Sequence, residues 1–377
     1  MNFRRVGAVA RKELLHVWRD PRSLLMAVGV PVLLLVLFGY ALTLDVDNVP
    51  MVVWDQSGTA ASRELVSRFG GSRYFSLRRY VDNYRALVRD IDDGKAMVGL
   101  VIPRDFAADL AAGRTTPLQL IVDGSDANTA TLTIGYAEAV TASYSQRMML
   151  QQFRRAGRPR VENPLDVRPR VWFNADLESK NFIFPGLIAV IMMVIAALLT
   201  SLTVAREWEG GTMEQLIATP VKGHELILGK LLPYFAIGLF DVLLAVLMGQ
   251  FLFQVPLHGS VALLFGMASI FLVGVLTLGI TISIVAKSQL LASQLAMTLT
   301  LLPSFLLSGF MFTIVNMPRP LQAITYLVPA RYFVALLKGI YLKGVGLEIL
   351  AGDAVLLLVF AAVMVLVANV MFKKKLA

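Results

Sequence analysis

The chain of 377 residues contains no cysteine and only three histidines. The absence of cysteine excludes disulfides, thiolate metal sites and cysteine nucleophiles, although it identifies no cellular compartment. The sequence also lacks a GxxxxGK[ST] phosphate loop, an HExxH zinc motif and a G-x-S-x-G nucleophile elbow. The histidines, His16, His224 and His258, lie far apart and suggest no metal site. We therefore predict that the chain is not an enzyme and binds no cofactor or metal.

Charged residues are scarce, at 16% of the chain, whereas soluble domains average roughly a quarter. Hydrophobic residues make up 56%, and the mean hydropathy is +0.67. The net charge of +9 is spread along the chain and flanks apolar runs, without a basic stripe interleaved with aromatic residues. This pattern favours a membrane surface over nucleic acid as the partner of the cations.

Six apolar stretches approach or exceed the roughly 20 residues that a helix needs to cross a bilayer. They cover residues 23–44, 182–204, 227–253, 260–286, 289–315 and 349–372. The first is too long for the apolar part of a signal peptide. We predict an α-helical integral membrane protein with six transmembrane helices and an inserted extracytoplasmic α/β domain. Its parts are an amphipathic helix (1–22), transmembrane helix 1 (23–44), the external domain (45–180) and transmembrane helices 2–6 (181–377).

The orientation follows from lysine and arginine near the spans, which favour the cytoplasm. These residues are Arg4, Arg5, Arg11, Lys12, Arg19, Arg22, Lys287, Lys373, Lys374 and Lys375. Both termini and residues 206–225 are then cytoplasmic. The segment 316–348 falls outside despite four cations, and we predict short helices at the outer interface, broken at Pro320 and Pro329. A seventh span would cost about 2.5–3.5 kcal/mol for each cation in hydrocarbon.

Residues 3–18 are predicted to form an amphipathic helix before the first span. Its apolar residues recur at steps of three and four, and share one face opposite the cations: Phe3, Val6, Ala10, Leu14 and Val17. Such a helix lies in the plane of the membrane surface. The alternative is that these charges only direct topology.

The external domain alternates strand and helix patterns, which is typical of a small α/β fold. Strands are predicted at 50–55, 73–80, 95–103 and 117–126, and helices at 59–69, 83–94 and 104–113. A long helix from Asn128 to about Arg155 and a proline-rich connection lead back to the membrane. Such a domain can bind substrate, dock a partner or only pack.

A polar island, REWEGGTMEQLIATP at 206–220, separates two apolar runs. Thr212 and Gln215 have the spacing of a capping box, so a short helix is predicted from about Met213 to the residues before Pro220. This helix exposes Met213, Leu216 and Ile217 beside Glu214, and is too short to be stable alone. It therefore docks into a cytoplasmic protein, or the island is a tight loop whose glutamates balance Arg206 and Lys222.

Asp241 lies near the middle of the predicted third span. A carboxylate at that depth faces the bundle interior, a partner subunit or a water-filled path. Asp241 therefore either belongs to a transport path or makes a structural hydrogen bond. Ion-coupled carriers commonly have several such groups and inverted repeats, which are not seen here. The energy for transport is therefore predicted to come from another chain.

Together these features resemble an ABC-2 type transporter permease, of the bacterial multidrug-export-like branch with a large external domain between the first two spans. The most specific segments are WFNADLESKNFIFPGLIAV (172–190), REWEGGTMEQLIATP (206–220) and LVPARYF (327–333). The resemblance implies a subunit that pairs with a second permease copy or paralogue and with two cytoplasmic ABC ATPase subunits, which hold ATP and magnesium. It implies export across the bacterial inner membrane, and a periplasmic adaptor is a further expected partner.

The resemblance also implies roles for individual segments. The helix at 213–218 matches the coupling helix that docks into the ATPase, residues 3–18 match the elbow helix, and about 316–345 match re-entrant helices. The expected coupling residues are Glu207, Glu209, Gly210, Gly211, Thr212, Met213, Glu214, Leu216 and Ile217. The substrate is expected to be hydrophobic or amphipathic, drug-like or lipid-like. The alternatives are an ion-coupled carrier or channel, and a membrane scaffold that recruits envelope proteins.

Overall fold

The structure is a computed structural model that describes residues 2–42, 46–155, 172–174 and 178–372. The chain forms two compact units, which we describe separately. One is Leu44–Pro169, and the other combines Met1–Thr43 with Arg170–Ala377. The predicted proline-rich connection and the lysines at 373–375 lie outside the described residues.

The unit Leu44–Pro169 contains a four-stranded sheet in the order β2-β1-β3-β4. Its strands are β1 (Val49–Asp55), β2 (Phe75–Tyr80), β3 (Val98–Ile102) and β4 (Gln119–Val122). Strand β1 pairs in parallel with β2 and β3, whereas β4 is antiparallel to β3. Its helices are α4 (Ala60–Gly70), α5 (Tyr84–Asp92), α6 (Phe106–Ala111) and α7 (Ala127–Arg155). The predicted α/β elements are confirmed.

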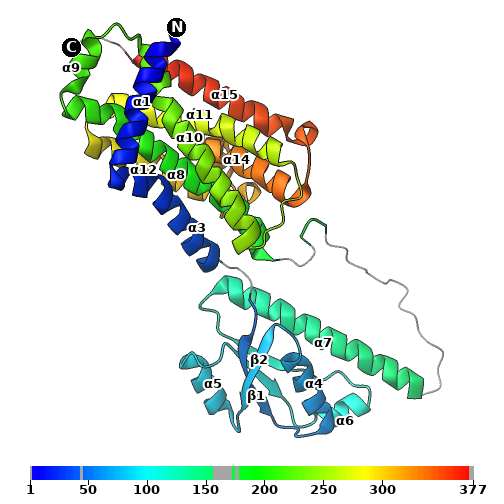
Figure 1. Cartoon of the computed structure of the whole chain (residues 1–377). Helices are drawn as coiled ribbons and strands as arrows, with labels where there is room; N and C mark the ends of the chain where they lie inside the picture. Colours follow the sequence, from blue (N-terminus) through cyan, green and yellow to red (C-terminus); the bar gives the residue numbers. More distant parts are fainter. Residues whose placement is uncertain (1, 43–45, 156–171, 175–177, 373–377) are drawn as a thin grey trace. The chain divides into compact units, whose positions relative to one another are not determined.

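The two faces of this sheet are buried by different helices (Figure 1). Met51 and Val53 of β1 pack in one cluster with Leu65 of α4 and with residues of α6 and α7. The intervening Val52 packs on the other face with Leu87 of α5. Because neighbouring strand residues point to opposite faces, strands covered on both sides are apolar throughout. This explains the continuous apolar run MVVW.

Arg79 of β2 holds the buried carboxylate of Asp90 at the end of α5. Arg79 Nε donates to Asp90 Oδ2 at 2.8 Å, and Nη2 donates to Oδ1 at 2.6 Å. These hydrogen bonds from Arg79 outweigh burial and hold the pKa of Asp90 below its usual value. The ion pair therefore stabilises the unit above the unfolded pKa, and this stabilisation is lost as the pH falls through the lower folded pKa.

Replacing Asp90 with asparagine is expected to lower the melting temperature at neutral pH. The difference from wild type should shrink below about pH 4, where Asp90 of the unfolded wild-type chain begins to be protonated. Thermal unfolding of the full chain at several pH values measures this effect. Asp93→Asn is the matched control, because that carboxylate is exposed and forms an ion pair with Lys95, which is also exposed. If the difference in melting temperature between Asp90→Asn and wild type did not vary with pH, the stabilising role of the ion pair between Arg79 and Asp90 would be contradicted.

The other unit is a helical bundle arranged around α8 (Ser179–Glu209). Helix α8 packs against α3 (Val30–Ala41), α10 (Gly223–Leu247), α11 (Val261–Ala286), α12 (Gln289–Leu307) and α14 (Pro329–Lys338). The remaining elements are α1 (Phe3–Arg19), α2 (Pro21–Leu24), α9 (Thr212–Ala218), α13 (Arg319–Thr325), α15 (Leu347–Met371), the 3-10 turn Ile314–Asn316, and the π-helical turns Leu25–Gly29, Met248–Leu252 and Gly339–Lys343. Helix α8 is buried along almost its entire length.

Five described helices are long and apolar enough to cross a membrane: α8, α10 with its π-helical extension, α11, α12 and α15. The predicted first span contains the shorter apolar helix Leu25–Ala41, which begins with a π-helical turn. The pair formed by α13 and Pro329–Lys343 is bent by 84° and makes a sixth candidate only if it is counted as one broken span. The predicted number of six spans is therefore not confirmed.

The segment 316–345 forms two short helices, as predicted, but α14 does not lie on a surface. Phe333, Leu336 and Leu337 of α14 are fully buried in the bundle. Lys338 Nζ donates to the carbonyl oxygen of Gly309 at 2.9 Å and lies 3.5 Å from the centre of the Phe182 ring. The cation is thus paired inside the protein, which permits burial of α14.

Helix α1 forms over the predicted residues, and three of the five residues of its predicted apolar face are buried in the protein. Val6, Ala10, Glu13 and Val17 are buried, whereas Phe3 and Leu14 of the predicted apolar face are 77% and 48% exposed. The buried face packs on α10. Contact is so close at Gly229 that an added Cβ atom would lie 2.6 Å from Val9 Cβ. The buried stripe also contains Glu13, a carboxylate that the predicted apolar face did not include.

Candidate functional site around helix α9

A glycine pair turns the chain from α8 into α9. Helix α8 ends at Glu209, and Gly211 has a φ of +67°, which favours glycine because other residues are strained there. Thr212 is the first residue of α9, and its side chain does not cap the helix. Instead its hydroxyl donates to the carboxylate of Glu207. The predicted capping box of Thr212 and Gln215 is therefore wrong.

A buried lysine joins three helices beneath this turn. Lys230 of α10 is 2% exposed, and its Nζ lies 2.5 Å from Glu13 Oε1 of α1 and 3.4 Å from Glu207 Oε1 of α8. The same nitrogen donates to the carbonyl oxygen of Thr203 at 3.3 Å. All three donors of the ammonium group therefore have acceptors, which a buried cation needs.

Lys12 of α1 completes the cluster from its exposed side. Its Nζ lies 2.5 Å from Glu207 Oε1. The carboxylate of Glu207 therefore pairs with Lys12 and Lys230 and accepts a hydrogen bond from the Thr212 hydroxyl. Two lysines thus balance the two glutamates, Glu13 and Glu207. We call these four residues the charge cluster. Through Thr212, it connects the first residue of α9 to α1, α8 and α10.

Helix α1 also holds the chain that follows α9. Arg5 Nη1 donates to the carbonyl oxygen of Pro220 at 2.6 Å. The backbone N–H of Asn2 donates to Glu225 Oε1 at 2.7 Å, and Glu225 Oε2 accepts from the backbone N–H of Lys222. Residues at the start of α1 therefore contact the chain between α9 and α10.

Glu209 connects the end of α8 to the start of α12. Its carboxylate accepts from the backbone N–H of Gln289 at 2.8 Å and from Gln289 Nε2 at 2.5 Å. Nearby, Lys287 Nζ lies 5.2 Å from the centre of the Trp208 ring. Two of the three island glutamates, Glu207 and Glu209, thus pair with residues of this same chain.

The exposed surface of α9 differs from the predicted one. Met213 was predicted to be exposed but is 3% exposed and buried against the bundle, and Leu216 is only half-buried. The side chain of Ile217 lies outside the described residues. Glu214 is exposed, and within the described part of the chain its carboxylate makes no hydrogen bond or ion pair. Glu214 is thus the island glutamate available to another protein.

Glu13, Lys12 and Lys230 are not among the predicted site residues. A signal existed for the first, because Glu13 falls between Ala10 and Val17 at helical spacing on an apolar stripe. Lys230 lies in a mostly apolar helix, where an isolated cation also requires a partner. No sequence pattern indicated that these two residues meet.

Asp241 is buried in α10, at 3% exposure. Its Oδ1 makes no hydrogen bond within the described residues. The side chain therefore faces the interior, as expected. One of the two interpretations was a structural hydrogen bond, and Oδ1 makes no such bond within the described residues.

Comparison with known proteins places these features in one family. A model of the ABC-2 family of transporter proteins matches residues 21–369. This chain belongs to the ABC-2 transporter family. The ABC-2 protein is 40% identical over 365 residues to YbhS, a probable multidrug ABC transporter permease of Escherichia coli K12, covering 97% of this chain and 95% of YbhS.

Two further relatives cover nearly the full length of this ABC-2 protein. YbhR, another probable multidrug ABC transporter permease of E. coli K12, is 32% identical over 374 residues, covering 99% of each chain. The linearmycin resistance permease protein LnrN of Bacillus subtilis is 23% identical over 394 residues, covering 96% of this chain and 97% of LnrN. Membership of this family, with five long apolar helices, makes the chain a multi-pass membrane protein.

Proposed function

We propose that this ABC-2 protein is the membrane-spanning subunit of an ATP-driven exporter and receives force through α9 from a separate ATPase. The observation that carries the proposal is the connection of α9. A seven-residue helix presents the exposed Glu214, which has no partner within the described residues, and is connected through Thr212 to the charge cluster. Glu214 would pair with a basic residue of the ATPase, and the half-buried Leu216 would pack beside it.

Force on α9 would reach the centre of the bundle through the charge cluster. ATP binding closes two ATPase subunits together and moves the helices docked in them. Thr212, Glu207 and Lys230 then carry the displacement to α8, α1 and α10. Because α8 packs against most of the bundle, a small displacement at its end would shift several helices as rigid bodies. ATP drives this change because it binds the two states differently.

The proposed arrangement places this chain in the bacterial inner membrane with α9 and both termini in the cytoplasm. The unit Leu44–Pro169 then lies on the outer side, where a periplasmic adaptor would dock. A second permease copy or paralogue completes the transport path. Apolar helices and relatives named as multidrug permeases favour a hydrophobic or amphipathic substrate.

Glu214→Lys is expected to reduce co-purification of the ATPase at least about tenfold, because a repulsive pair replaces an attractive one. The measurement is quantitative mass spectrometry of proteins that accompany the tagged chain from its native membrane. Glu138→Lys, a charge reversal at another exposed glutamate, on α7, is the matched control and should retain the ATPase. Full ATPase recovery with Glu214→Lys would exclude Glu214 as a docking residue.

Asp241 favours a second candidate, an ion-coupled carrier, because one of its buried carboxylate oxygens has no described partner. The two functions differ in their energy source. Transport that stops on ATP depletion but continues when ionophores collapse the ion gradients supports the exporter. The opposite result, together with no associated ATPase, selects the carrier.

A further inference from the structure

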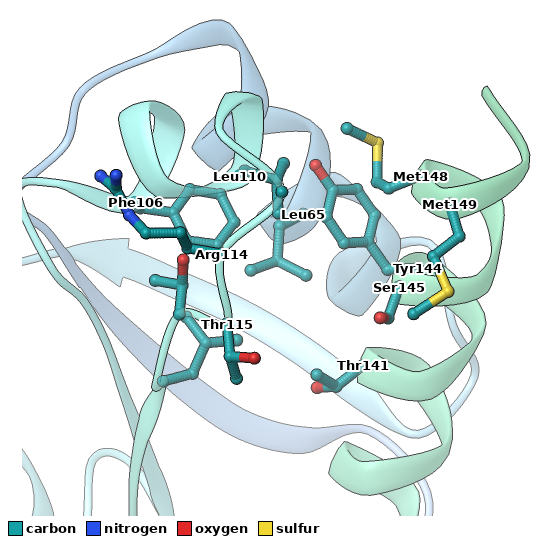
Figure 2. Close-up of a pocket in the computed structure, with 13 residues that line it drawn as sticks. Leu65, Phe106, Leu110, Arg114, Thr115, Thr141, Tyr144, Ser145, Met148 and Met149 are labelled. Carbon is teal, nitrogen blue, oxygen red and sulfur yellow. The ribbon is translucent and has the colours of Figure 1, made fainter. Parts of the chain in front are cut away.

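The unit Leu44–Pro169 contains a pocket with a cavity volume of about 220 Å³, walled by α4, α6, α7 and the segment 113–118 (Figure 2). The charge of Arg114 in its wall is balanced by Asp109 Oδ1, to which Nε and Nη2 donate at 2.9 and 2.5 Å. The hydroxyl of Tyr144 donates to the carbonyl oxygen of Ala61 at 3.2 Å. These polar groups are satisfied without a ligand, in contrast to those of a pocket in the helical bundle.

The pocket in the helical bundle has a cavity volume of about 530 Å³ and lies where the end of α1 meets the end of α8. Residues from three helices that carry the argument below line it: His16 and Asp20 at the end of α1, Leu199, Leu202 and Arg206 of α8, and Tyr234 of α10. All of them belong to one compact unit, so the shape of the pocket does not depend on the external domain.

Arg206 brings a half-buried positive charge to this pocket without a carboxylate partner. Its Nε lies 3.5 Å from Gln289 Oε1, and its Nη1 donates to His16 Nε2. Neither acceptor carries a charge, and Nη2 makes no hydrogen bond within the described residues. Guanidinium groups that are partly buried pair well with carboxylates or phosphates. The pocket therefore holds a cation that an anionic ligand would balance.

Two further donors in the pocket wall have no acceptor in the described part of the chain. The side chain of Tyr234 is 4% exposed, and its hydroxyl makes no hydrogen bond but, unlike Asp241 Oδ1, is not enclosed by protein. Because His16 accepts from Arg206 at Nε2, its ring hydrogen lies on Nδ1, which becomes the other donor. The charge of Arg206 also acts on the Tyr234 hydroxyl, so the two groups lie near one another.

Positive charge exceeds negative charge around this pocket. Asp20 contributes one carboxylate, which accepts from Ser23 Oγ at 2.6 Å. An adjacent cavity of about 670 Å³ shares Asp20 and is bordered by Arg11 and Arg19. Both arginines are exposed and form no ion pair with any residue that the structure describes. Together with Arg206 they leave an excess of positive charge, which attracts anions.

The pocket wall changes from polar to apolar along α8. Arg206, Leu202 and Leu199 are spaced by four and three residues and therefore share one face of the helix. At 1.5 Å per residue, Leu199 lies about 10 Å further into the apolar part of α8 than Arg206. Nearby on α1, Trp18 is 74% exposed, and tryptophan is typical of the membrane–water interface. A ligand with a charged head and an apolar chain matches this wall.

We propose that this pocket binds an anionic phospholipid, with its phosphate at Arg206 and Tyr234 and an acyl chain along Leu202 and Leu199. The arginine at the end of α8 and the leucines further along it match the direction of a lipid in a bilayer, with its head at the surface. A soluble phosphate compound would leave the leucine wall uncovered. The inference goes beyond the exporter function and does not depend on it, since a carrier in the same membrane could hold the same lipid.

The test is a titration of the detergent-purified full chain with phosphatidylglycerol, read by native mass spectrometry. Phosphatidylcholine with the same acyl chains should bind at least about tenfold more weakly, because its choline cation meets the arginines. Glycerol 3-phosphate, which has the phosphate but no acyl chain, should not displace the lipid at equal concentration. Displacement by glycerol 3-phosphate would assign the site to a soluble anion, and equal binding of the two lipids would remove the role of charge; either result overturns the proposal.

Three variants test the residues of the pocket. Arg206→Gln should weaken phosphatidylglycerol at least about tenfold, the usual effect of losing a hydrogen bond to a charged group. Arg319→Gln, at an exposed arginine on α13, is the matched control and should bind as wild type. Tyr234→Phe should weaken the lipid about 3- to 10-fold. It should leave the melting temperature of the lipid-free chain unchanged, because the hydroxyl has no described partner.

The tyrosine variant keeps the proposal testable if Arg206→Gln does not fold. Wild-type affinity for phosphatidylglycerol in folded Arg206→Gln or in Tyr234→Phe would overturn the proposal. Equal weakening by Arg319→Gln and Arg206→Gln would also overturn it, because the lipid would then respond to the overall charge of the protein and not to this pocket.

Discussion

Replacing Lys230 with methionine is expected to destabilise the protein by about 3–5 kcal/mol, the usual effect of removing one partner of a buried ion pair. Without the ammonium group, the carboxylates of Glu13 and Glu207 remain buried, and Glu13 loses its ion-pair partner. Lys12 compensates only Glu207, from the exposed side. Thermal and denaturant unfolding of the purified chain measure the loss.

Two comparisons test this reason for the destabilisation. Lys222→Met removes a more exposed lysine eight positions earlier and should change stability by no more than about 0.5 kcal/mol. Adding Glu13→Gln to Lys230→Met should restore much of the lost stability, because it removes the uncompensated buried charge. If Lys230→Met and Lys222→Met unfolded alike, the charge cluster would not stabilise the bundle.

Gly279→Val is expected to cost about 3 kcal/mol or more by forcing α11 away from α8. A Cβ atom at Gly279 would overlap the carbonyl oxygen of Ala197 and the hydroxyl of Thr200, which are both on α8. A backbone oxygen cannot turn away as a flexible side chain can. The helices must therefore separate along a contact that lies at the centre of the bundle.

The matched control for this substitution lies on the same helix. At Gly266 of α11, an added Cβ atom would have no neighbouring atom within 4 Å, so Gly266→Val should fold nearly as wild type. The yield and melting temperature of the detergent-purified chains compare the two variants directly. Similar stability of both would mean that α8 and α11 do not approach as closely as the structure indicates.

The α/β unit was predictable because its signals are local. Met51 and Val53 face one set of helices and Val52 the other, so the strand appears as an unbroken apolar run between turn residues. Its helices begin at capping residues such as Thr59 and Asn83, which the neighbouring sequence reveals. Strand and helix patterns of this kind need no information about distant residues.

The site around α9 was only partly predictable. Its position follows from the polar island, but the partners of its glutamates lie far away, with Lys12 separated from Glu207 by 195 residues and Lys230 from Glu13 by 217. All three island glutamates are therefore predicted to couple to another protein. Met213 is predicted on the outside but is buried, because a short amphipathic segment does not indicate which face meets the bundle.

The unequal burial of the helices determines where lipid thickness acts on this fold. Helix α8 is enclosed by protein, whereas α12 and α15 are mostly exposed. At about 1.5 Å per residue, the 19 residues of α12 span about 28 Å, slightly less than a hydrocarbon core of about 30 Å. A short exposed helix meets hydrophobic mismatch by thinning the bilayer or recruiting a neighbour. Among the five long apolar helices, α12 is therefore the one whose energy depends most on bilayer thickness, and it packs directly on the central helix α8.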